Sequence, residues 1–334
     1  MKTKRISYIV ALGLSLLLLS CENVIEFPGN ITKPLLVVNS FITPDSLIKV
    51  HVSKSKFFLV NTNATNYEVV NNATVNVWVN DKKIEKMASI GEGYYQATFK
   101  PKVGDIVKVT AENADFSEVS TFTETVKTNP ILAADTANHV FEETPMINGS
   151  STNGGPLIID TIGITKTESF DLKIKFKDPG GIANFYKINL KIKNFYDNDS
   201  TAFDYVNINS NDLVFGNNNN MGPLEVANYS YDHEFSDELF NGKEYDLKLT
   251  FSTNTTIYNA GHYDIYKTKS PIKRELYIEL QSISESYFKY IRSCSASSNT
   301  IEFFSEPVQI YSNVKGGIGI MGSYSSSYYK IQLK

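Results

Sequence analysis

Apolar and polar residues alternate in short segments along the first third of the chain, which is the pattern of β-strands with one buried face. The clearest segment is 74–79, where Val75, Val77 and Val79 face one side and Asn76 and Trp78 face the other. Comparable strands are expected at 35–42, 47–58, 87–90, 95–99, 106–109 and 116–126. About seven short strands with a turn roughly every eight to twelve residues are typical of a sandwich. The pattern therefore predicts an immunoglobulin-like β-sandwich over residues 34–128.

A second β-rich domain is expected at 129–334, because alternation lapses over 127–134, which include Asn129 and Pro130. Its clearest strands are 170–176, 182–195, 245–251 and 275–283, followed at the end of the chain by a strand rich in Ser and Tyr. Polar surface loops are expected at 148–156 and 211–223, and the second of these can bury nothing. The fold class is all-β, with a second, larger β-sandwich-like domain after the first.

One short helix is predicted within the second domain, over residues 285–295. Ser284 is the N-cap candidate, and apolar residues then recur at spacings of three and four, at Tyr287, Phe288, Ile291 and Cys294. This helix is expected to cover one end of a sheet. Cys294 on its apolar face is expected to be a buried thiol.

The first twenty-one residues have the three parts of an export signal. Lys2, Lys4 and Arg5 form a positive start, residues 9–19 are an apolar stretch too short to span a bilayer, and Ser20 precedes Cys21. We interpret residues 1–20 as a signal peptide. The sequence Leu-Leu-Ser-Cys at 18–21 resembles a bacterial lipobox, which implies lipidation of Cys21 and a lipidated tether over 21–33. A plain secretory signal beside a cysteine is the alternative, and a transmembrane anchor is a further one.

Composition narrows the partners of the mature chain. Removal of residues 1–20 takes away three positive charges, so the formal net charge goes from −4 to −7. Nucleic acid is excluded as a partner, because affinity for phosphate chains comes from clustered Lys and Arg. The chain has 2 cysteines, and a lipidated Cys21 would leave Cys294 without a partner, so no disulfide framework is expected. The 20 Tyr and 20 Phe favour strands.

The motifs of catalysis and cofactor binding were sought, and the sequence nominates no catalytic, cofactor-binding or metal-binding residue. Residues 317–322 fit G-x-G-x-x-G, but a dinucleotide site needs this turn inside a βαβ unit, and only a strand follows. These glycines are instead expected to allow tight turning or close backbone approach, and to position the last strand against the core of the second region. The 4 histidines are far apart, and no G-x-S-x-G elbow occurs. A hydrolase site stays open as an alternative, in which strands bring together two carboxylates that are far apart in the sequence.

Several segments resemble one family of bacterial lipoproteins. The C-terminal segments 305–308, 311–314 and 316–322 carry the most specific resemblance, and 36–39, 93–95 and 277–290 agree with it in order. The chain thus resembles the family catalogued as domain of unknown function 4249, over nearly all of its mature length. The resemblance implies a surface or outer-membrane lipoprotein of the Bacteroidetes, often encoded beside TonB-dependent receptors. The family as a whole has no assigned catalytic residues.

Two functions of different classes follow as hypotheses. The first is a non-catalytic outer-membrane or cell-surface lipoprotein, held to the membrane by its N-terminal lipid, which serves as accessory subunit of a TonB-dependent transporter or related complex and captures or gates substrate. Its partner would be an outer-membrane barrel protein. Tyr324, Tyr328 and Tyr329 offer rigid contact area for such a partner, and the alternative is that they pack within a sheet. The alternative is a surface-anchored hydrolase of glycans or peptides with its site in the second domain. Adhesion through the loops is a third option.

Overall fold

The computed structural model describes residues 33–56, 68–150, 158–197, 200–204, 206–209, 212–215, 233–258, 271–298 and 309–333. Side chains are described for these residues except 148–150, 158–160, 255–258 and 298. The predicted signal peptide, Cys21 and nearly all of the predicted tether lie outside the described residues. The all-β prediction is confirmed, because the described chain is built of strands in several sheets with one α-helix.

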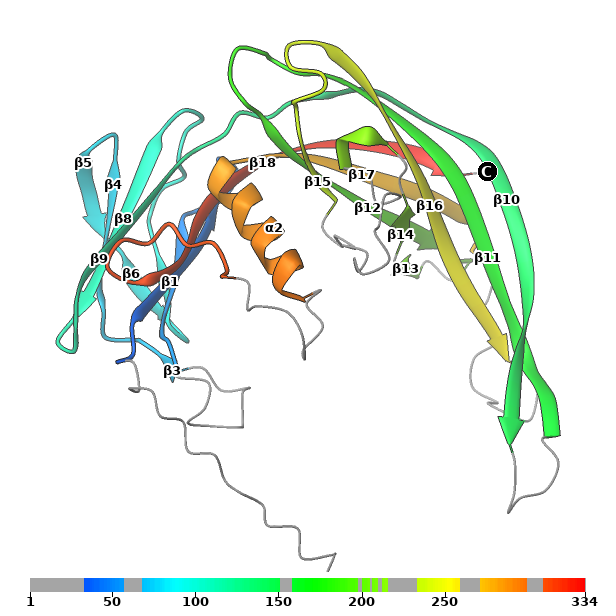
Figure 1. Cartoon of the computed structure of the whole chain (residues 1–334), viewed down its shortest axis with the longest axis horizontal. Coiled ribbons are helices and arrows are strands. Elements are labelled where there is room, and N and C mark those ends of the chain that lie inside the picture. The colour runs from blue at the N-terminus through cyan, green and yellow to red at the C-terminus, as the bar shows by residue number, and fades with distance from the viewer. Residues whose placement is uncertain are drawn as a thin grey trace, which may run out of the picture.

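A 10-stranded sheet extends through both halves of the molecule, and its long dimension forms the back of an arch (Figure 1). Its main path has the order β13-β12-β17-β18-β1-β2-β7-β6, with β15 paired to β12 and β3 paired to β2. The bounds are β1 Leu36–Ile42, β2 Lys49–Lys54, β3 Glu68–Val69, β6 Ala88–Gly91, β7 Tyr94–Gln96, β12 Phe185–Phe195, β13 Thr201–Asp204, β15 Glu234–Ser236, β17 Lys273–Ile283 and β18 Ile318–Leu333.

The first lobe is a sandwich of β1, β2 and β7 against a 4-stranded sheet of order β5-β4-β8-β9. Alternate residues of both sheets point inward and form one core, which includes Val38, Val50, Val77 and Val109. Tyr95 lies within this core, and its hydroxyl accepts from Ala73 N and donates to Val70 O, at 2.8 Å each. The bounds of the second sheet are β4 Thr74–Val79, β5 Lys82–Lys86, β8 Ile106–Asn113 and β9 Phe116–Glu124.

The second lobe packs β12, β17 and the end of β18 against a 4-stranded sheet of order β10-β11-β16-β14. Its core is separate from the first and is rich in aromatic residues, with Phe176, Tyr186, Phe235 and Phe240 in mutual ring contact. The bounds are β10 Ile131–Ser150, β11 Ile158–Lys177, β14 Asn207–Asn209 and β16 Glu244–Tyr258, with a single 3₁₀ turn, η1, at Leu213–Phe215 among the described residues.

Strand β18 joins the two lobes, because each half of it pairs in a different one. Residues 318–323 pair in parallel with β1, and residues 324–333 pair antiparallel with β17. The side chains of Ser323 and Ser325 are fully buried between the two cores, where larger side chains would keep the neighbouring chain away. The N-terminal lobe is thus completed by the end of the chain, while the division at residue 129 stays a prediction.

The α-helix α2, Glu285–Ser298, lies on the inner side of the arch (Figure 1). Its predicted start is confirmed, because Ser284 Oγ accepts a hydrogen bond from Tyr287 N at 3.3 Å, which is the geometry of an N-cap. The helix covers the middle of the long sheet. Cys294 is half-buried instead of buried, which corrects the expectation of a buried thiol.

Other differences from the sequence prediction lie in both lobes. Strand β10 runs for 20 residues where a crossing segment and the start of a polar loop were expected, and it pairs with all of β11. Residues 148–150 of the expected loop at 148–156 therefore belong to β10, and residues 151–156 lie outside the described residues. Within the expected loop at 211–223, the structure places η1, whose Val214 is buried in the second core. Strand β5 was not predicted, because its sequence is mostly charged.

Candidate binding face

The described histidines, which are far apart in the sequence, lie on or beside different elements of the structure. His51 lies on β2, His139 on β10 and His233 before β15, while His262 falls outside the described residues. Within the described part of the chain, no group of three or more His, Cys, Asp or Glu residues could hold a metal ion. The described helices also include none that is long and apolar enough to cross a membrane.

The glycine run holds β18 close to β1. A Cβ atom on Gly319 would lie 2.1 Å from the carbonyl oxygen of Val38, and one on Gly317 would lie 2.5 Å from that of Leu36. Gly319 also has φ +123, which L side chains rarely adopt. The close backbone approach expected from the sequence is confirmed. The expected partner was wrong, because these glycines pack against the first lobe instead of the core of the second region.

We define the inner face as the surface of the 10-stranded sheet that points away from both cores. Helix α2 packs across its middle through aromatic contacts, the closest being Phe41 with Tyr287 at 4.5 Å and Phe185 with Phe288 at 4.6 Å between ring centroids. Gly322 on β18 makes room for the helix, because a Cβ atom there would lie 2.8 Å from the Cβ of Tyr287. The helix thus divides the inner face into two halves.

An open depression of about 470 Å³ occupies the half on the first lobe. Its side chains come from a row of paired residues across β1, β2 and β7, namely Asn39, His51 and Tyr94, with Phe41 and Lys49 beside them. The ring of Tyr94 lies 4.7 Å from that of His51. Burial lowers the pKa of His51, and a hydrogen bond to the backbone at Glu92 opposes the shift. His51 is therefore held mainly neutral at pH 7.

A hydrogen-bonded carboxylate occupies the other half of the inner face. Glu279 on β17 accepts from Ser326 at 2.7 Å, Gln281 at 3.0 Å, Asn189 at 3.1 Å and Tyr328 at 3.1 Å. Burial alone would raise the pKa of Glu279, but these hydrogen bonds together outweigh it and hold the pKa below its usual value. The carboxylate is therefore ionised at neutral pH, and it fixes the surrounding side chains in one arrangement.

Aromatic side chains stay exposed on both halves of the inner face. Tyr328 is 70% exposed, Phe203 58%, Tyr94 43% and Phe41 39%. Of the C-terminal tyrosines noted in the sequence, Tyr328 lies on this face, whereas Tyr329 is partly buried against the second core. Rigid aromatic rings bury much area at low cost in conformational entropy, which is why they are enriched where proteins bind partners.

A larger open depression, of about 840 Å³, lies on the opposite surface of the second lobe, across β10, β11 and β16. Carboxylates line it, and most are held by neighbours. Asp171 accepts from Asn138 at 2.7 Å and from Thr250 at 3.2 Å, while Asp212 accepts from the hydroxyl of Tyr245 and from Lys248 N at 2.9 Å. Burial and the bond to Asp212 raise the pKa of Tyr245. These groups brace the edge of the sheet.

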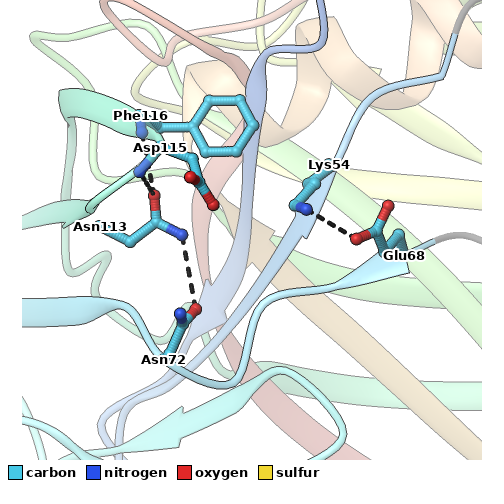
Figure 2. A network of polar contacts seen from close by, with 6 residues as sticks. All are labelled: Lys54, Glu68, Asn72, Asn113, Asp115 and Phe116. Carbon is cyan, nitrogen blue, oxygen red and sulfur yellow. Dashed lines mark hydrogen bonds and ion pairs between the residues drawn. The ribbon is translucent and has the colours of Figure 1, made fainter.

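A polar network fastens the end of the first lobe from which the N-terminal segment leaves (Figure 2). Lys54 at the end of β2 donates to Glu68 of β3 at 2.6 Å, and its ammonium lies 5.9 Å from the centre of the Phe116 ring. The hydrogen bond to Glu68 raises the pKa of Lys54 and lowers that of Glu68. Leu35 N donates to Ser55 Oγ at 2.8 Å in the same region. The first residues of the described chain are thus tied firmly to the lobe.

Comparison with known families gives one match, to the family model described as Domain of unknown function (DUF4249), over residues 22–330. The matched region spans both lobes, α2 and nearly all of β18. No curated protein matches the chain.

Proposed function

The chain belongs to the DUF4249 family, and on this premise we propose that it is a non-catalytic, lipid-anchored lipoprotein of the outer membrane. In this proposal it is the accessory subunit of a TonB-dependent transporter or a related complex, and it captures or gates the transporter's substrate. The anchor is an acylated Cys21, and the protein partner is an outer-membrane barrel.

Lipidation at Cys21 is supported by the order of segments at the N-terminus. The positive start, the apolar stretch and the small residue before Cys21 all precede the family match, which begins at residue 22. An acyl anchor keeps the chain within a short tether of the membrane. Confinement of this kind raises its effective concentration near any membrane partner, so modest contacts suffice for binding.

The observation that carries the binding role is the inner face. A sheet surface that both lobes share presents exposed Phe41, Tyr94, Phe203 and Tyr328 around a helix and a fixed carboxylate. Such a mixture of rigid aromatic rings and ordered polar groups suits a protein interface. The alternative, a surface-anchored hydrolase of glycans or peptides, would place its site in the larger depression, which carboxylates line.

Membrane fractionation tests the anchor. Cys21→Ala should release the chain from the membrane fraction, and the mass of the wild-type protein should include the added acyl chains. Lipidation would be contradicted if the variant stayed as firmly bound to the membrane and the wild-type protein showed no added acyl mass.

Affinity purification of the tagged full-length chain from detergent-solubilised membranes tests the binding role. We expect an outer-membrane barrel protein in near-equal amount. Tyr94→Ala should lower its recovery several-fold, whereas Phe122→Ala, which truncates an exposed ring on β9 away from the inner face, should not. Recovery of the lipoprotein alone, with turnover of a glycan or peptide by the purified protein, would favour the hydrolase.

A further inference from the structure

Strands β10, β11 and β16 continue well past the second core and form a three-stranded arm (Figure 1). The core residues of β11 lie within 170–176, while residues 158–169 of the same strand pair only with β10 and β16. At a rise of roughly 3.3 Å per residue, this extension is about 40 Å long. Residues 164–169 of β11 are only half-buried among the described residues, so their exposed parts meet solvent, a partner or lipid.

Charge along the arm falls toward its end. Near the base, Lys166 pairs with Glu143 at 3.0 Å, and Arg274 pairs with Glu168. From Thr144 to Thr165 the sequence contains Asp160 as its one charged residue. The described side chains near the end are uncharged, and apolar ones alternate there with Thr144, Thr161 and Thr165. We call the apolar ones the arm tip: Pro145, Met146, Ile147, Ile162 and Ile164. Ile147 is 63% exposed. Exposed apolar groups at the end of a projection mark a contact with something apolar.

The position of the arm tip relative to the start of the chain identifies the contact. The start of β1 and the end of the arm lie on the same side of the arch, the side opposite its back (Figure 1). The segment from Cys21 to Lys33 can span about 40 Å at most when fully extended. An acylated Cys21 therefore places the bilayer on the side toward which the arm projects.

We propose that the arm tip is a second membrane contact, which inserts its apolar side chains into the surface of the bilayer that holds the acyl chains of Cys21. The inference rests on the proposed anchoring at Cys21. Isoleucine, methionine and proline are suited to this position, because they remove apolar area from water and bring no charge into the interface. The two contacts hold the arch by both ends, so the inner face is turned toward the plane of the membrane, where the opening of a barrel lies.

Fluorescence of the reconstituted, acylated full-length protein tests the proposal. In a Cys294→Ser background, Ile147→Cys is labelled with an environment-sensitive nitrobenzoxadiazole dye, and the protein is placed in vesicles of phosphatidylethanolamine and phosphatidylglycerol. The matched control is Ile182→Cys, an isoleucine of similar exposure, 70%, in the turn that follows the other end of β11. We expect emission at position 147 to shift to the blue and rise at least two-fold, with quenching by brominated lipids, and emission at position 182 to stay unchanged.

Flotation of the same vesicles separates this proposal from that of the anchor. A protein that floats with the vesicles while the dye at position 147 responds like that at position 182 overturns the arm contact and leaves the anchor intact. A protein that does not float and carries no acyl mass overturns both. A response at position 147 only when a barrel protein shares the vesicle also overturns the lipid contact, and assigns the arm to that protein.

Discussion

Replacement of Gly319 by alanine should separate β18 from β1 and destabilise the first lobe. The added methyl group would lie 2.1 Å from the carbonyl oxygen of Val38, about 1 Å closer than carbon and oxygen approach in strands. The neighbour is backbone and cannot rotate away, so the strand must shift and lengthen the ladder hydrogen bonds between β1 and β18. A positive φ of +123 adds conformational strain for any L residue.

Two glycines nearby separate these two costs. Gly104 has φ +84 and open space around its Cβ position, so Gly104→Ala carries only the backbone strain, about 1 kcal/mol. Gly317 lacks a positive φ but would place its Cβ 2.5 Å from Leu36 O, so Gly317→Ala carries only the clash, about 1 to 3 kcal/mol. Gly319→Ala carries both, so we expect a loss of about 2 to 4 kcal/mol.

Equilibrium unfolding in denaturant measures this order. Trp78 on β4 is the one tryptophan of the chain, so its fluorescence follows the first lobe. The midpoint should fall least for Gly104→Ala and most for Gly319→Ala, with an unchanged slope. A Gly319→Ala protein that unfolds at or above the midpoint of Gly104→Ala would refute the close packing of β18 on β1.

Two hydrogen-bonded groups of the second lobe, Glu279 and Tyr186, give further predictions. Glu279→Gln should lower the free energy of unfolding by about 1 to 2 kcal/mol at pH 7. Because the pKa of Glu279 is depressed in the folded state, its contribution to stability is present above the unfolded pKa of about 4.3 and is lost as pH falls further. In denaturant melts at a series of pH values, the difference in unfolding free energy between wild type and Glu279→Gln should therefore shrink below about pH 4. Tyr186→Phe removes a 2.5 Å hydrogen bond to the buried carboxylate of Asp178 and should cost about 2 kcal/mol. Burial and Asp178 raise the pKa of Tyr186, so the stability lost in Tyr186→Phe should persist up to about pH 10 and decline above it. For either variant, a stability difference from wild type that does not change with pH would contradict the role given to that side chain.

Local alternation located the strands in which one face is buried throughout. The segment 74–79 coincides with β4, and β12 alternates between buried and half-buried positions along nearly its whole length, as its sequence indicates. Strand β10 could not be found in this way. It contains Pro145 and Gly149, which are typical of turns, and its register with β11 shifts at Asn138, where φ is positive. Pairing with a long neighbour, and not local pattern, makes it a strand.

The candidate face was only partly visible in the sequence. Tyr324, Tyr328 and Tyr329 were identified as contact area because their rings are rigid and amphipathic, and Tyr328 is exposed on the inner face whereas Tyr329 packs against the second core. Glu279 was not found, because it lies on β17 while its partners Asn189 on β12 and Ser326 and Tyr328 on β18 are brought to it only by the folded sheet. The pairing of β18 with both lobes was missed for the same reason, since parallel pairing between the two ends of a chain leaves no local signal in the sequence.

Site-specific photo-crosslinking in intact cells tests most directly whether the inner face binds a barrel protein. A photoreactive amino acid is placed at Tyr94 and, separately, at Tyr328, one on each half of that face, and at Ile182 as an equally exposed control. The account predicts that both inner-face positions crosslink to the same outer-membrane barrel protein and that position 182 does not. Absence of crosslinks from positions 94 and 328, or equal crosslinking from position 182, would contradict it.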